Sequence, residues 1–230
     1  MFLKDYIPNI DKRFGRISFS GLAFESSKVK KNNIFFAIKG NYFDGNNFIQ
    51  KAIQKGAKII VSEKNILIKN KNIIFIRTQN VRKLLAETSY KILGKKPNTL
   101  VAVTGTNGKS SVADFYYQIL NLNNKRVASI GTIGIKYNDK KNILNKTTLD
   151  PIQLSLILKH LKKKRIEFVI LEASSHGLKQ NRLDGLNFDI GIFTNLSHDH
   201  LDYHKTIKNY FNSKLYLFKS LMKKKSNIVS

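Results

Sequence analysis

The segment 104–111 carries the residue types of a phosphate-binding loop. Gly105 and Gly108 are followed at once by Lys109 and Ser110, which gives the pattern GxxGKS between an apolar strand-like run and a helical one. Small residues let backbone N–H groups close around phosphate oxygens, and the N-terminus of the helix adds partial positive charge. Lys109 can neutralise outer phosphates, and the Ser110 hydroxyl can bind Mg²⁺. The longer Walker pattern has a further glycine where this chain has valine, and the short pattern also occurs in ordinary turns.

Two segments that read as strands each run into polar residues suited to hold a cation. Phe168–Leu171 leads directly into Glu172, and Ile190–Phe193 leads into a stretch that contains His200. In a nucleotide-binding α/β sheet, ligands bind beyond the carboxyl ends of the strands. A carboxylate there is the hard oxygen ligand that Mg²⁺ prefers. Glu172 is therefore a candidate Mg²⁺ ligand, and His200 is a candidate either for a second Mg²⁺ or for orienting a phosphate.

Four of the five histidines lie between residues 176 and 204, which raises two other possibilities. A zinc site is disfavoured because the chain has no cysteine and no HExxH spacing. A catalytic dyad of Ser174 or Ser175 with His176 is conceivable, but there is no GxSxG turn, and adjacent residues at a strand end seldom face one another. Taken alone, each histidine is more often a hydrogen-bonded loop residue than a metal ligand.

The segment after His204 is predicted to be a helix with a lysine beside its apolar face. A core-facing stripe at helical spacing is formed by Ile207, Phe211, Leu215, Phe218 and Leu221. Lys214 lies on the flank of that stripe, where shielding from water lowers the pKa of an amine. A neutral amine can react with CO₂ to form a carbamate, which is a carboxylate on a long arm. From these residues alone, the alternative is a surface lysine whose stem lies along the apolar face.

The spacing of apolar runs predicts the framework that positions these groups. In the first half, the expected strands are Arg16–Phe19, Ile34–Ile38, Lys58–Val61 and Ile73–Ile76, with helices near Phe48–Lys55 and over Val81–Leu93. Gly56 is expected to end the first of these helices. The polar segment 94–98 contains a glycine and a proline, so it marks the boundary between a domain over 1–94 and a domain over 95–230.

The second half is predicted to be an α/β domain with a mostly parallel sheet that carries the phosphate loop. Its expected strands are Leu100–Val103, Phe168–Leu171 and Ile190–Phe193, with helices after the loop and over Ile152–Lys163. Alternation of strands with helices favours parallel βαβ units. The chain is therefore assigned to the α/β class, as a small N-terminal α/β domain followed by a central domain with a phosphate loop.

Composition restricts the class of protein. Apolar residues form 42% of the chain, no apolar run is long enough to span a membrane, and the N-terminus lacks the apolar core of a signal peptide. The absence of cysteine excludes disulfides, so a cytoplasmic location is the simplest expectation. The net charge of +26 suggests a polyanionic partner, but the lysines are dispersed and accompanied by Asn and Ile. That pattern favours compositional drift over nucleic-acid binding.

Several motifs in a fixed order resemble the Mur ligases, ATP-dependent enzymes that build the peptide of the bacterial cell wall. They are TGTNGKSS, TTLDP, LEASSHGLKQNRLDG and FTNLSHDHLDYHKTIKNYFNSKLYLF, while FESSKVKKNNIFFAIKGNYFDG resembles the family's N-terminal uridine-nucleotide segment. The SSH after the strand-end glutamate is similar to the members that add the third residue of the stem peptide. It differs from the folylpolyglutamate synthetases, which share the phosphate loop. The resemblance covers nearly the whole chain.

The resemblance implies a role for each matching residue. ATP phosphates would be held by Gly105, Thr106, Asn107, Gly108, Lys109, Ser110 and Ser111. Mg²⁺ would be held by Ser110, Glu172, His200 and a carbamylated Lys214. The catalytic residues would be Lys109, His200 and Lys214. The resemblance thus favours carbamylation over the surface-lysine alternative.

The resemblance also implies contacts to a substrate, UDP-N-acetylmuramoyl-L-alanyl-D-glutamate. The muramoyl dipeptide would contact Thr147, Thr148, Ser174, Gln180 and Arg182, and the uridine nucleotide would contact Ser26, Asn41, Tyr42 and Phe43. Arg182 has the fork geometry that binds a carboxylate. The chain departs from the family pattern at 25–27, 41–43 and Lys146, which bears on the uridine and sugar contacts and leaves the chemistry intact.

The implied reaction is ATP-dependent peptide-bond formation in peptidoglycan precursor synthesis, through an acyl phosphate. Its participants would be the UDP-sugar dipeptide, ATP, Mg²⁺ and an amino acid that this sequence does not specify. No nucleic acid or membrane is implied, and a monomer is expected. Family members continue into a third domain that supplies the amino-acid pocket, so these 230 residues alone are expected to be inactive. The alternatives are a non-catalytic nucleotide-binding fragment and a ligase of the folylpolyglutamate type.

Overall fold

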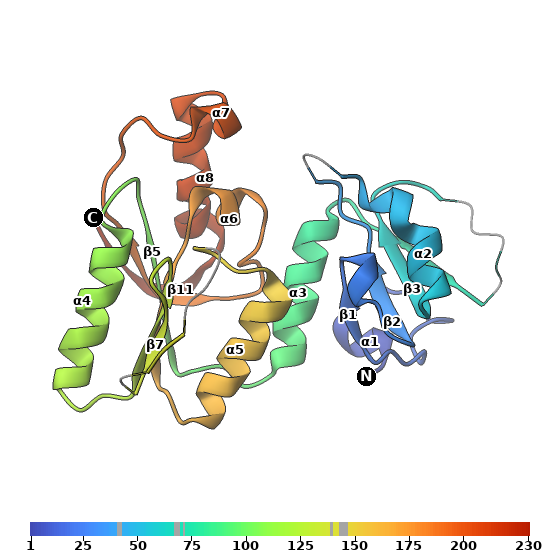
Figure 1. Cartoon of the computed structure of the whole chain (residues 1–230), viewed down its shortest axis with the longest axis horizontal. Coiled ribbons are helices and arrows are strands. Elements are labelled where there is room, and N and C mark those ends of the chain that lie inside the picture. Colours follow the sequence, from blue (N-terminus) through green and yellow to red (C-terminus); the bar gives the residue numbers. More distant parts are fainter. Residues whose placement is uncertain (41–42, 67–69, 71, 139, 143–146) are drawn as a thin grey trace. The chain divides into compact units, whose positions relative to one another are not determined.

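The chain folds into two compact units, which are described separately. The computed structural model describes residues 1–230 except 41–42, 67–69, 71, 139 and 143–146 (Figure 1). Its contacts divide the chain into Met1–Ile92 and Leu93–Ser230, close to the boundary expected from the polar segment. Within the described residues, no helix is long and apolar enough to cross a membrane.

The first unit is built on a four-stranded parallel sheet whose strands follow chain order. The strands are β1 (Gly21–Ala23), β2 (Asn33–Phe36), β3 (Ala57–Ser62) and β4 (Ile74–Arg77). The helices are α1 (Leu3–Tyr6), α2 (Ile49–Gln54) and α3 (Val81–Leu93), with 3₁₀ turns η1 (Ser26–Lys28) and η2 (Gly45–Phe48). Every residue of β2 is buried, as in a parallel sheet covered on both faces. Gly56 follows α2 with a φ of +98°, as expected for the residue that ends a helix.

The expected strand at Arg16–Phe19 was wrong, because the sheet of the first unit begins at Gly21. The backbone of this segment bonds instead to the N-terminal residues of the chain. The N–H of Leu3 donates to the carbonyl of Ile17 at 3.0 Å, and a single antiparallel bridge joins Phe2 to Ser18. The apolar alternation is therefore used in a local pairing outside the parallel sheet.

The second unit is a seven-stranded sheet in the order β11-β10-β5-β9-β6-β7-β8. Its strands are β5 (Thr99–Thr104), β6 (Val127–Gly131), β7 (Gly134–Tyr137), β8 (Lys140–Asn142), β9 (Phe168–Glu172), β10 (Phe188–Phe193) and β11 (Met222–Val229). Its helices are α4 (Lys109–Leu122), α5 (Pro151–Lys163), α6 (Ser175–Lys179), α7 (Leu201–His204) and α8 (Ile207–Ser220). Among these described strands only the β6–β7 and β7–β8 pairs are antiparallel, which confirms the mostly parallel α/β fold.

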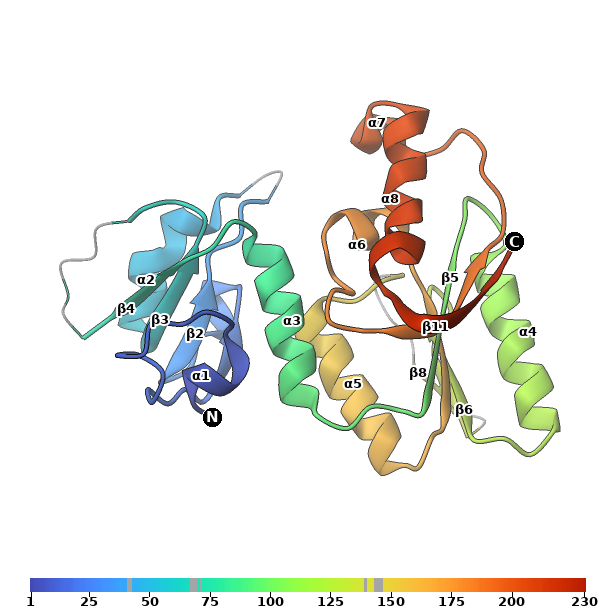
Figure 2. The same ribbon diagram turned by 180° about the vertical axis from the view of Figure 1, so that it is seen from behind.

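Helices cover both faces of this second sheet, with α4 on one side and α5 and α8 on the other (Figures 1 and 2). Residues that cap the N-termini of α5 and α8 stabilise the first turns of these helices. Asp150 caps α5 by accepting a hydrogen bond from the N–H of Gln153 at 3.0 Å, and Pro151 occupies the first turn. Thr206 caps α8 in the same way through the N–H of Asn209 at 3.1 Å.

The expected core-facing stripe of the last helix was correct at Leu221, which is 3% exposed, but wrong at Ile207. The buried residues of α8 are Tyr210, Ser213, Lys214 and Leu217, while Ile207 is 36% exposed. Phe211 and Phe218 of the expected stripe are half-buried and pack against Phe193 of β10, with their ring centroids 6.2 and 6.1 Å from that of Phe193. The helix thus has two packed sides, and the more enclosed side is the polar one that carries Lys214.

A pair of leucines on α5 tests how strongly this packing stabilises the second unit. Leu158 is fully buried, whereas Leu156 on the same helix is 61% exposed. We expect Leu158→Ala to lower the free energy of unfolding by about 2–5 kcal/mol, because it leaves a cavity in the core. Leu156→Ala should change it by about 0.5 kcal/mol or less. Urea denaturation of both variants measures the difference, and equal losses would contradict the packing.

Candidate functional site

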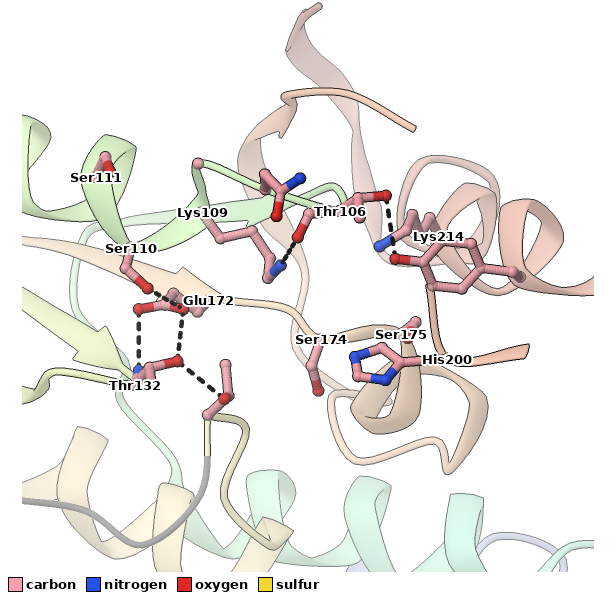
Figure 3. Close-up of a pocket in the computed structure, with 14 residues that line it drawn as sticks. Thr106, Lys109, Ser110, Ser111, Thr132, Glu172, Ser174, Ser175, His200 and Lys214 are labelled. Carbon is pink, nitrogen blue, oxygen red and sulfur yellow. Dashed lines mark hydrogen bonds between the residues drawn. The ribbon is translucent and has the colours of Figure 1, made fainter. Parts of the chain in front are cut away.

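A cavity of about 280 Å³ opens at the edge of the second sheet where β5 and β9 end (Figure 3). Parallel pairing of β5 with β9 and with β10 brings the segments that follow these strands together. The phosphate-loop segment, the β6–β7 turn, α6 and α8 all contribute to its walls. The cavity is lined by Thr106, Asn107, Gly108, Lys109, Ser110, Ser111, Thr132, Thr147, Glu172, Ser174, Ser175, His200, Tyr210 and Lys214.

The loop between β5 and α4 has a backbone that requires glycine. Gly105 has a φ of +149° and Gly108 a φ of +80°. A Cβ atom on Gly105 would lie 1.9 Å from the hydroxyl oxygen of Thr194, so no larger residue fits there. The amine of Lys109 folds back onto this loop and donates to the carbonyls of Gly105 at 2.9 Å and Thr106 at 2.7 Å. Burial lowers the pKa of Lys109.

The carboxylate of Glu172 lies at the base of the cavity and is almost fully buried. Its two oxygens accept three hydrogen bonds of 3.0 Å, from the Ser110 hydroxyl and from the N–H and hydroxyl of Thr132. A Cβ atom on Gly131 would lie 2.0 Å from the nearer carboxylate oxygen, so the carboxylate occupies space that only glycine leaves open. These contacts fix a negative charge beside the first turn of α4 (Figure 3).

Lys214 is 1% exposed, so this lysine is part of the interior and not of the surface. Its amine donates to the carbonyl of Gly105 at 2.6 Å and lies 4.3 Å from the ring centre of Tyr210. Burial and, to a lesser extent, the positive charge of Lys109 together lower the pKa of Lys214 to about 7. Near neutral pH, the Lys214 amine is therefore uncharged in a large share of the molecules. The same carbonyl accepts from both lysines.

Three histidines form a cluster beside the cavity. The ring centroid of His176 lies 4.8 Å from that of His200 and 5.4 Å from that of His204. His204 is 4% exposed, and its Nε2 atom lies 3.0 Å from the hydroxyl oxygen of Ser175. Burial lowers the pKa of His204 to about 4. Ser175 is therefore hydrogen-bonded to His204, while the dyad considered from the sequence paired it with His176.

Four of the five candidate substrate contacts of the second unit form one hydrogen-bonded chain, which runs through Ser174, Thr148, Arg182 and Gln180. The hydroxyl of Thr148 lies 3.0 Å from that of Ser174, and Thr147 lies 2.9 Å from Thr132. Arg182 donates to the side-chain oxygen of Gln180 at 2.7 Å and to the carbonyl of Thr148. This chain leads from the cavity to Arg182, which is half-buried.

The candidate uridine contacts belong to the first unit. Ser26 is half-buried in η1, and Phe43 is 73% exposed. Asn41 and Tyr42 lie outside the described residues, as does Lys146.

Several residues of the site were missed from the sequence. Thr132 lies in the turn between β6 and β7, two short strands that the apolar pattern did not indicate. Tyr210 is 1% exposed, and its hydroxyl donates to the Thr106 hydroxyl at 3.2 Å. The sequence contains a possible signal for each of them, a Gly-Thr pair at 131–132 and the Tyr-x-x-x-Lys spacing at 210–214. Among the described residues, no group of three or more His, Asp or Glu is placed to hold a metal ion.

Comparison with known proteins agrees with this arrangement. The family model described as the Mur ligase middle domain matches residues 103–230, which is most of the second unit. The chain belongs to the Mur ligase family. A second model, described as the Mur ligase family catalytic domain, matches residues 18–91 of the first unit.

Similar proteins among the Mur ligases are about twice as long as this chain. The UDP-N-acetylmuramoyl-L-alanyl-D-glutamate–2,6-diaminopimelate ligase of Rickettsia conorii is 43% identical over 216 residues, covering 91% of this chain and 44% of that protein. A solved structure of a ligase of the same name has a TM-score of 0.83 and 32% identity, covering 96% and 45% of the two chains. MurF from Thermotoga maritima in complex with ADP has a similar fold, with a TM-score of 0.55, 23% identity and coverages of 90% and 44%.

The buried His204 predicts how the stability of the chain depends on pH. Its pKa is about 4 in the folded chain against an ordinary value of 6.5. Between these values the unfolded chain binds a proton that the folded chain does not, so the free energy of unfolding falls as pH falls from about 6.5 to 4. We expect His204→Gln to reduce this slope in urea denaturation at pH 7, 5.5 and 4.5. The exposed His160→Gln serves as the control, and an unchanged slope in His204→Gln would contradict the assignment.

Proposed function

We propose that this chain is the uridine-nucleotide and ATP-binding part of a ligase that adds the third amino acid to UDP-N-acetylmuramoyl-L-alanyl-D-glutamate. The reaction belongs to peptidoglycan precursor synthesis and makes one peptide bond for each ATP consumed. One observation carries the proposal. Lys109, Glu172, His200 and Lys214, from four separate segments of a Mur ligase fold, line a single cavity.

The proposed chemistry has two steps, and no protein nucleophile is needed. The free carboxylate of the substrate's glutamate attacks the γ-phosphorus of ATP, ADP leaves, and an acyl phosphate forms. The amine of the incoming amino acid then attacks the acyl carbon, phosphate leaves, and the amine loses a proton. Lys109 would move from the carbonyls of Gly105 and Thr106 to the phosphates and offset their growing negative charge.

The donor set of the cavity fits Mg²⁺. Glu172 offers a carboxylate and Ser110 a hydroxyl, both hard oxygen ligands, and they already lie 3.0 Å apart. Among the described residues that line the cavity, Glu172 is the only acidic one, and Mg²⁺ commonly binds one or two carboxylates and completes its shell with substrate phosphates and water. When bound, Mg²⁺ neutralises phosphate charge. His200 is a further candidate ligand at the opposite wall.

Lys214 is proposed to act as a carbamate. The reaction with CO₂ joins the amine nitrogen to the carbon and releases one proton, so it needs the uncharged amine. A pKa of about 7 supplies that form near neutral pH. A buried ammonium beside Lys109 would add positive charge to a cation site, whereas a carbamate supplies oxygen atoms and negative charge. Its cavity-lining position supports this role.

The chain of residues from Thr148 to Arg182 is proposed to position the glutamate end of the UDP-sugar dipeptide. Arg182 and the hydroxyls of Thr147, Thr148 and Ser174 offer donors to carboxylate and amide oxygens. Ser26 and the 41–43 segment of the first unit are proposed to contact the uridine nucleotide. The name of the Rickettsia conorii relative supports diaminopimelate as the amino acid added.

Nucleotide binding by the phosphate loop is testable on this chain directly. We expect Lys109→Ala to weaken Mg²⁺·ATP binding about 100-fold in calorimetry, because it removes charge-assisted hydrogen bonds to the phosphates. Lys125→Ala, which changes an exposed lysine beyond the end of α4, should leave the affinity unaltered. Equal affinity of Lys109→Ala and the unchanged chain for Mg²⁺·ATP would contradict the assignment of the phosphate loop as the nucleotide site.

The carbamate role is testable in the full-length ligase by phosphate release. We expect Lys214→Ala to lose nearly all activity and a short carboxylate added in solution to restore part of it, since the acid replaces the missing oxygens. Lys214→Arg should stay inactive, because guanidinium keeps its charge and forms no carbamate. Intact mass under CO₂-rich conditions would detect the adduct. An active Lys214→Arg enzyme would rule the role out.

A further inference from the structure

The segment that follows β10 is hydrogen-bonded to the phosphate loop at Thr106 and Asn107. Residue 193 at the end of β10 pairs with Thr104 at the end of β5, so the segments that leave these strands start side by side. The backbone carbonyl of Asn195 accepts from the N–H of Thr106 at 2.9 Å. The N–H of Ser197 donates to the hydroxyl of Thr106 at 3.0 Å. The loop is therefore attached to a second loop and not only to its own strand and helix.

Asn195 holds both polar groups of the Asn107 backbone with its side chain. Its Oδ1 atom accepts from the N–H of Asn107 at 3.0 Å, and its Nδ2 atom donates to the carbonyl of Asn107 at 3.3 Å. The Thr194 hydroxyl donates to the same carbonyl at 2.6 Å. A carboxamide is the side-chain group that offers a donor and an acceptor at this spacing. We name these three contacts the Asn107 clasp.

The clasp fixes the direction of the next peptide group. In a trans peptide the carbonyl of one residue and the N–H of the next point in opposite directions. Holding the carbonyl of Asn107 toward Thr194 and Asn195 therefore turns the N–H of Gly108 to the other side of the loop. Gly108 lines the cavity and directly precedes α4, whose first-turn N–H groups have no partner within the helix.

The clasp also explains the glycine at 105. Thr194 occupies the space that a side chain at 105 would need, with 1.9 Å between its hydroxyl oxygen and a Cβ atom built there. The close approach of the two loops and the contacts to Asn107 thus depend on one another. Asn195 itself is exposed, so its contacts add little buried apolar surface.

We propose that Asn195 is a positioning residue for the nucleotide phosphates. Its carboxamide presets the Asn107–Gly108 peptide so that the amides from Gly108 onward are offered to the triphosphate, while those of Thr106 and Asn107 are held within the protein. This role rests on the proposed nucleotide site and adds to it a residue outside the phosphate-loop sequence.

Calorimetry of this chain with Mg²⁺ and either ATP or inorganic tripolyphosphate tests the role. Asn195→Ala should raise the Kd for both ligands about tenfold, because the peptide loses its preset direction. Asn195→Asp keeps the acceptor and the shape, loses the donor and brings negative charge, so it should raise both Kd values at least as much. Thr194→Val, which removes one of the three contacts, should raise them about threefold.

Thermal unfolding separates positioning from a merely structural role. Asn195 is exposed, so its variants should unfold at the temperature of the unchanged chain while their affinity falls. Asn123→Ala removes a comparable side-chain bond, 2.7 Å to the carbonyl of Ile119, at the far end of α4. This control should leave both Kd values as they are.

The outcomes distinguish the two proposals. If the unchanged chain binds neither ligand, the nucleotide site fails and the role of Asn195 fails with it. If the unchanged chain binds both ligands and the variants at 194 and 195 bind equally well, the role of Asn195 alone is overturned. A fall in unfolding temperature without a change in Kd would also overturn it, because the clasp would then act on stability only.

Discussion

A buried carboxylate sets the arrangement of the second unit. Glu172 is nearly inaccessible to water, and a buried charge is tolerated only where hydrogen bonds replace its hydration. The three bonds it accepts come from the first turn of α4 and from the β6–β7 turn, at Ser110 and Thr132. The carboxylate thus ties β9 to two other segments. It also explains Gly131, because any side chain there would occupy the position of the carboxylate.

The sequence indicated most of this framework because its signals are local. The helix over Val81–Leu93 has the predicted bounds, and the phosphate loop follows a strand and leads into a helix that begins at Lys109, as its pattern requires. The β6–β7 pair was not predicted, since four- and five-residue strands joined by a two-residue turn give too little apolar alternation. The strand β11 was not predicted either. It contains three exposed lysines, which are typical of an edge strand but in the sequence resemble a solvated chain end.

Residues that act through tertiary contacts were the harder part of the site. Lys214 resembled a surface lysine because helical spacing cannot tell which of two packed sides is more enclosed, and only the family resemblance favoured a role. Asn195 gave no signal of its own, and the spacing of Tyr210 from Lys214 did not show its partner, as each contacts a loop about ninety or a hundred residues earlier in the chain. Phe115 and Ile119 of α4 look like core residues but are 60% and 59% exposed. The spacing of apolar residues indicates which faces a helix has, but not which elements pack against each face.

The amine of Lys109 rests on two carbonyls of its own loop, and Gly105 accepts from Lys214 as well. Under the proposed function, ligand entry is therefore an exchange of partners and not the filling of unmet bonds. Because these contacts already order the loop before a ligand arrives, binding does not include the entropy loss of ordering it.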